Sequence, residues 1–140
     1  MTPTEYFLFL LDKAFVYDDL WPLTLLLLAL VELALYKNYT VDRKPFCRRH
    51  LLALVPFIFP VFFLVWGTLF EHTQSPAHNI PAWQVRALSM AFEIQVAISG
   101  ASLAYLKEVR LSVAALGLFQ VYLSLYPWNI AEKSVTGDWF

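Results

Sequence analysis

Charged residues are scarce in this sequence. They make up only 15% of its 140 positions, whereas an average soluble domain holds about 25%. The 59% hydrophobic content therefore indicates an integral membrane protein, and we expect the plasma or inner membrane. Because the basic residues form no patch outside one connection, we expect no nucleic-acid partner.

Cysteine is nearly absent too, since Cys47 is the only one. A single cysteine excludes an internal disulfide framework and a CxxC redox pair. The sequence also lacks the HExxH, GxSxG, GxGxxG and P-loop motifs, so whether the protein is an enzyme stays open, and we expect no cofactor. Glu71, His72 and His78 lie in one connection, but their spacing matches no known ligand motif, so we expect no metal site.

Four long hydrophobic segments are what the sequence does contain. They run over 20–36, 51–70, 83–106 and 111–128. At 1.5 Å per residue they cover about 25 to 36 Å, which suits a hydrocarbon core of about 30 Å. The sequence thus predicts an all-α fold in a single domain, 1–140: a four-helix transmembrane bundle with a short N-terminal interfacial helix over 4–17. We expect Pro56 and Pro60 to kink the second span, and the residues after 128 to form an outer tail.

Basic residues are concentrated in two of the connections. Lys107 and Arg110 lie between the third and fourth spans, and five more lie between the first and second: Lys37, Arg43, Lys44, Arg48 and Arg49. The positive-inside rule places both connections in the cytoplasm and both termini on the non-cytoplasmic side. We expect a tight hairpin turn at 107–110. We also predict that Arg43, Lys44, Arg48 and Arg49 contact anionic lipid headgroups.

The third span is the richest of the four in small and polar residues. On a helical wheel one stripe holds Arg86, Met90, Glu93, Ala97, Gly100, Ala104 and Lys107, and a second holds Gln95, Ser99 and Ser102. Small residues let helices approach closely in lipid. We therefore predict that this helix packs through Ala97, Gly100, Ala101 and Ala104, with Gly117 on the fourth span.

Glu93 lies near the middle of that span. A charged side chain at the bilayer centre costs about 2.5 to 3.5 kcal/mol, so we expect Glu93 to face the protein interior and hydrogen-bond Gln120, with Arg86 two turns away. Two interpretations stay open. Glu93 is either a polar clamp between helices, or a functional carboxylate with Arg86 and Gln120 as candidate catalytic or binding partners.

Three functions fit these patterns. The first is a small membrane protein that works by assembling, as a homo-oligomer or as a non-catalytic subunit of a membrane complex. The second is a membrane-embedded enzyme or binding protein for a lipophilic molecule, using Glu93. The third is an oligomeric channel or pore. The packing stripes and the lack of site motifs favour the first, with the lipid bilayer, further copies or other membrane subunits as partners.

Overall fold

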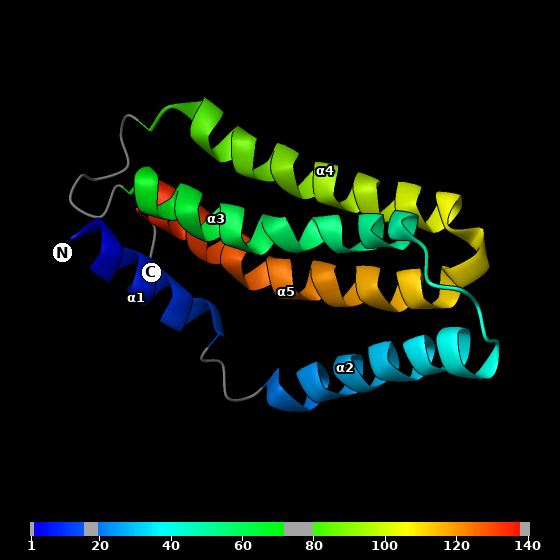
Figure 1. Cartoon of the computed structure of the whole chain (residues 1–140). Helices are drawn as coiled ribbons and strands as arrows, with labels where there is room; N and C mark the ends of the chain where they lie inside the picture. The colour runs from blue at the N-terminus through cyan, green and yellow to red at the C-terminus, as the bar shows by residue number, and fades with distance from the viewer. Residues whose placement is uncertain (1, 16–19, 72–79, 138–140) are drawn as a thin grey trace. The chain divides into compact units, whose positions relative to one another are not determined.

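The all-α prediction is confirmed by a computed structural model, which describes residues 2–15, 20–71 and 80–137 (Figure 1). Five α-helices occupy these residues: α1 Pro3–Phe15, α2 Trp21–Leu35, α3 Ile58–Leu69, α4 Ala82–Tyr105 and α5 Arg110–Thr136. A π-helix, η2, covers Tyr36–Val41, and two 3₁₀ helices, η3 and η4, cover Arg48–Phe57 and Lys107–Val109. The chain divides into two compact units, 1–17 with 58–94 and 123–140, and 18–57 with 95–122.

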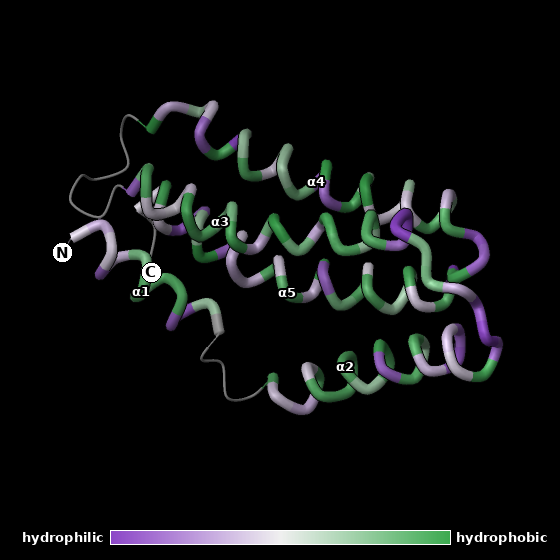
Figure 2. Tube along the Cα trace, in the orientation of Figure 1, coloured by the Kyte–Doolittle hydropathy of each residue, from purple (hydrophilic) through white to green (hydrophobic). Residues whose placement is uncertain are grey.

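Four helical stretches are long and apolar enough to cross a membrane, as predicted. They are Trp21–Val41, Arg48–Leu69, Ala82–Tyr105 and Lys107–Thr136. Hydrophobic residues recur along the whole length of these helices, and hydrophilic residues gather in the 42–47 connection and around η4 (Figure 2). Only 11% of the most apolar window of Trp21–Val41 is buried in the fold, so most of this helix is left to an apolar surrounding such as lipid.

Two boundaries differ from the prediction. The first span continues beyond residue 36, because η2 follows α2 without a break. The fourth continues beyond residue 128 as helix to Thr136, so the residues predicted as an ordered or semi-ordered tail extend the helix. Its residues carry a buried face, Ile130, Ala131 and Val135, and burial of that face stabilises the extra turns.

The second span changes helix type along its length. Its first ten residues form η3, with Pro56 inside, and α3 follows directly. Pro56 and Pro60 have no amide hydrogen, so neither can close an i to i−4 hydrogen bond. Both prolines are buried in the fold.

The first unit is built around α1, α3, the first half of α4 and the end of α5. Tyr6, Leu10 and Ala14 recur every four residues on α1 and pack against Leu64 and Ile130. A second buried cluster contains Phe63, Leu88, Ala91, Ala131 and Val135. The short N-terminal helix of the prediction therefore exists, and one face of it belongs to the core of this unit.

Reciprocal hydrogen bonds fix the beginning of α1. The backbone N–H of Thr2 donates to Glu5 Oε2 at 2.7 Å, and the backbone N–H of Glu5 donates to Thr2 Oγ1 at 3.3 Å. This is a capping box, with Pro3 at the first helical position, where a missing N–H costs nothing. The hydrogen bond from the Thr2 backbone N–H to the Glu5 carboxylate lowers the pKa of Glu5.

The second unit contains the turn between α4 and α5. Leu106 leaves the helical conformation at φ −92° and ψ 56°, and η4 follows. Leu106, Val109 and Val113 form a buried cluster with Ala53. The tight hairpin predicted at 107–110 is confirmed, and its apolar residues anchor the turn in the core of the unit.

Candidate functional site

The stripe of α4 that holds Glu93 and the predicted packing residues points outward. Its members are exposed: Arg86, Met90, Glu93, Ala97, Gly100 and Ala104, together with Ala101 beside them. The buried residues of α4 are Gln84, Leu88, Ala91, Gln95 and Ser102. At 100° per residue, these lie on the opposite side of the helix. The inward orientation predicted for Glu93 is therefore wrong.

Glu93 occupies the centre of the exposed face. It has eleven residues of α4 before it and twelve after it. Neither Glu93 nor Arg86 has an ion pair or side-chain hydrogen bond among the residues that the structure describes. A Cβ built on Gly100 meets no atom within 4 Å. The protomer thus leaves both a carboxyl group and small residues uncovered halfway along a candidate span.

Gln120 is buried, with 1% of its surface exposed. The side-chain Nε2 of Gln120 donates to the backbone carbonyl of Ala53 at 2.6 Å. The backbone carbonyl of Gln120 accepts from Gln95 Nε2 at 3.2 Å. The interhelical clamp that we expected from Glu93 is made instead by Gln95 and Gln120, which link η3, α4 and α5 in the second unit. Gly117 is half-buried nearby, where an added Cβ would lie 3.7 Å from Ser99 Cβ.

A cluster of ionisable groups, which we call the basic-end cluster, joins the two basic connections in the second unit. It consists of Tyr39, Lys44, Arg49, His50 and Glu108. Tyr39 Oη lies 2.8 Å from His50 Nδ1, and His50 Nε2 lies 3.3 Å from Glu108 Oε1. Arg49 Nη2 lies 2.7 Å from the same carboxylate oxygen, and Lys44 Nζ donates to the Glu108 carbonyl. Both connections therefore lie at one end of the unit.

The contacts of His50 indicate its tautomer. The backbone N–H of Cys47 points to Nδ1 at 3.4 Å, so Nδ1 acts as acceptor there and can also accept from the Tyr39 hydroxyl. Nε2 then carries the hydrogen and donates to Glu108. A histidine held between a phenol and a carboxylate can relay a proton. Tyr39 is only partly buried, whereas the His50 side chain is 4% exposed.

A polar chain next to this cluster ties α2 and η2 to α5. Asn38 Nδ2 donates to Ser112 Oγ at 2.6 Å, and Ser112 Oγ donates to the Ala34 carbonyl at 3.0 Å. The hydrogen bonds of a π-helix span one residue more than those of an α-helix, and such segments occur at functional sites. Here it carries the buried Asn38.

We did not predict the basic-end cluster from the sequence. Neither His50 nor Glu108 was among the candidate site residues. One signal was available, because positive-inside sorting places both connections at the same end. Of the predicted headgroup ligands, Lys44 and Arg49 contact Glu108, and Arg43, Arg48 and Arg49 are exposed.

The histidines considered as metal ligands, His72 and His78, lie outside the described residues. Within 2–15, 20–71 and 80–137, no three histidine, cysteine, aspartate or glutamate side chains are grouped to hold a metal ion. No protein-family model, curated protein or solved structure matches this chain. Its function must therefore be argued from its own residues.

Proposed function

We propose that this chain is a multi-pass membrane protein that works by assembling with further copies of itself through the exposed face of α4. The observation that carries the proposal is Glu93, exposed at mid-helix with no partner among the described residues. In a lipid-facing position a charged side chain costs about 2.5 to 3.5 kcal/mol. Contact with a second protein surface removes that cost.

The residues around Glu93 suit such a contact. Ala97, Gly100 and Ala104 follow it at helical spacing, and all three are exposed. Small side chains allow two membrane helices to approach closely, so that van der Waals contacts and interhelical hydrogen bonds replace contacts with lipid. The same face would serve a protomer within a larger membrane complex, in which another subunit takes the place of the second copy.

Gly100→Leu tests the proposal without disturbing the protomer. The side chain enters open space, because nothing lies within 4 Å of its Cβ. We expect the wild-type protein in nanodiscs to show an oligomeric mass by native mass spectrometry, and Gly100→Leu to be monomeric. Ala29→Leu is the matched control, since Ala29 is exposed on α2, and it should keep the wild-type mass. A monomeric wild type, or an unchanged Gly100→Leu oligomer, would contradict assembly through α4.

Gly67 offers the opposite control, for folding. A Cβ at Gly67 would lie 3.0 Å from Ala131 Cα, where helices of the first unit approach closely. Gly67→Leu should therefore unfold the protomer, whereas Gly100→Leu should keep its helical content. This contrast distinguishes loss of assembly from loss of fold.

The other two functions make different demands on the same residues. A membrane-embedded enzyme would need Glu93, Arg86 and Gln120 around one pocket, but Glu93 and Arg86 are exposed and the Gln120 amide is bound to Ala53. This alternative has less support. A pore is a special case of assembly, in which Glu93 from several copies faces a common axis. Ion conductance that is lost in Glu93→Gln would indicate this case.

A further inference from the structure

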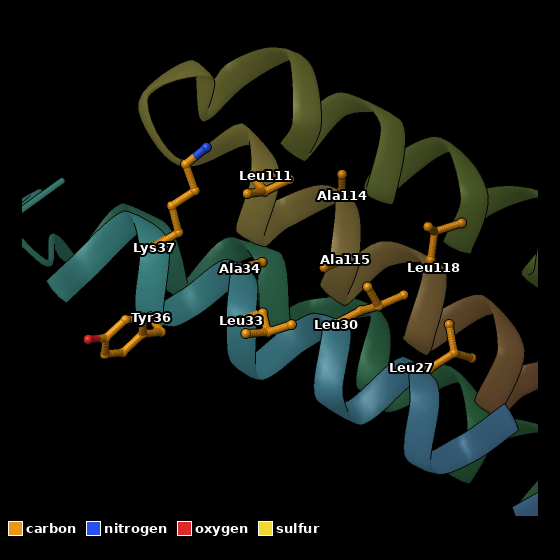
Figure 3. A pocket seen from close by; sticks show the side chains of 10 residues that line it. All are labelled: Leu27, Leu30, Leu33, Ala34, Tyr36, Lys37, Leu111, Ala114, Ala115 and Leu118. Atoms are coloured by element: carbon orange, nitrogen blue, oxygen red, sulfur yellow. The ribbon is translucent and has the colours of Figure 1, made fainter. Parts of the chain in front are cut away.

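An apolar groove runs between α2 and α5 in the second unit (Figure 3). Its volume is about 490 Å³, within the range of about 300 to 1,000 Å³ that is usual for ligand sites. Leucines of α2, Leu27, Leu30 and Leu33, face the α5 side, where Ala114 and Ala115 leave room. Apart from two residues at one end, the lining is entirely apolar.

Hydrogen bonds join the two helices at both ends of the groove. Thr24 Oγ1 lies 2.7 Å from Tyr122 Oη at one end. At the other end, Ser112 bonds to Asn38 and to the Ala34 carbonyl. Because each end is fixed by a polar contact, the space between the helices is part of the fold of this unit.

The polar end of the groove is formed by Tyr36 and Lys37. Figure 3 shows the Lys37 ammonium at this end, near Leu111. Lys37 is exposed, and within the described ranges its side chain has no ion pair. By contrast, Lys44 and Arg49, in the basic-end cluster, contact Glu108.

The length of the groove matches one leaflet. The side formed by α2 and η2 runs from Leu27 to Lys37, a span of eleven residues or about 15 Å along a helix. That is half of a hydrocarbon core of about 30 Å. A lysine at the surface of the leaflet and an apolar channel below it fit the charge and the chain of a single lipid.

We propose that this groove binds one phospholipid with an anionic headgroup, its acyl chain lying between α2 and α5 and its phosphate meeting Lys37. The site is separate from the exposed face of α4, so it does not depend on assembly. It also differs from the headgroup contacts predicted from sequence, because it adds a built channel for the chain.

The test is native mass spectrometry of protein taken from nanodiscs of equal parts phosphatidylglycerol and phosphatidylcholine. We expect wild type to retain one phosphatidylglycerol with about fivefold preference, the effect of one lysine beside an anionic headgroup. Lys37→Gln should remove the preference. Lys107→Gln is the matched control, because Lys107 is exposed, lies outside the groove and is not among the predicted headgroup ligands, and it should keep the preference.

Filling the groove tests the position of the chain. Ala115→Leu should fill the groove and prevent retention of either lipid. Leu30→Trp should also block lipid binding, because Leu30 lines the groove at an exposed position outside the buried core. The proposal is overturned if Lys37→Gln keeps the preference, or if both filled variants retain lipid as wild type does. If the filled variants lose an oligomer but retain lipid as wild type does, the groove binds a second copy of the chain, and the lipid proposal is overturned.

Discussion

Removing the hydroxyl of Ser134 should destabilise the first unit more than removing that of its partner Tyr6. Ser134 Oγ lies 2.7 Å from the Gly67 carbonyl and 2.8 Å from Tyr6 Oη. Since a carbonyl only accepts, the Ser134 hydroxyl donates to Gly67, and the Tyr6 hydroxyl must donate to Ser134. The carbonyl of Gly67 is one of the last four of α3 and has no intrahelical partner.

The costs follow from what each change leaves unpaired. Tyr6→Phe deletes one neutral hydrogen bond, and Ser134 keeps its donated bond, so we expect a loss of about 1 kcal/mol. Ser134→Ala deletes two and leaves the Tyr6 hydroxyl and the Gly67 carbonyl unpaired, for about 2 to 4 kcal/mol. Burial raises the pKa of Tyr6, so its phenol stays a neutral donor throughout the working pH range.

The assay is chemical unfolding in mixed micelles, followed by circular dichroism. The free energies of unfolding of both single variants and of the double variant form a cycle. The double variant should cost no more than Ser134→Ala alone, because Tyr6→Phe removes the unpaired hydroxyl. A smaller loss for Ser134→Ala than for Tyr6→Phe, or strictly additive losses, would refute the donor assignment.

Two further predictions concern the helix ends. His50→Ala should lower the free energy of unfolding by about 1 to 3 kcal/mol, since it leaves Tyr39 and Glu108 without their shared partner. Thermal unfolding in nanodiscs measures this loss, and an unchanged stability would contradict the basic-end cluster. Hydrogen bonds from Thr2 lower the pKa of Glu5 below its ordinary value of 4.5. The capping box should therefore be complete above pH 4.5, and it should be lost as the pH falls through the lowered pKa of Glu5. The Thr2 amide NMR shift should titrate below 4.5; a midpoint at or above it would contradict the bond.

Hydropathy alone was enough to predict the helices. Each span is a long apolar run, and this pattern depends only on neighbouring residues. The helix ends were less predictable, because the last turns of α5 depend on burial of Ile130 and Val135 by residues far away in the sequence. Sequence patterns report such contacts poorly.

The buried side of α4 could not be read from the sequence for a physical reason. Its apolar residues lie on all sides, so polarity does not distinguish a face against protein from a face against lipid. The small residues around Gly100 are predicted to pack, but within the fold the buried side of α4 is that of Gln95 and Ser102. Likewise, His50 and Glu108 are 58 positions apart in the sequence. They meet only because the two basic connections lie at the same end of the second unit.

The most direct test of the central claim, assembly through the exposed face of α4, is disulfide crosslinking in native membranes. Cys47 is the only cysteine, so Cys47→Ser provides a clean background. In that background Ala97→Cys should crosslink two copies on mild oxidation, because a disulfide requires Cα atoms within about 7 Å. Ala29→Cys, exposed on α2, should stay monomeric. Equal crosslinking at both positions, or none at residue 97, would contradict the claim.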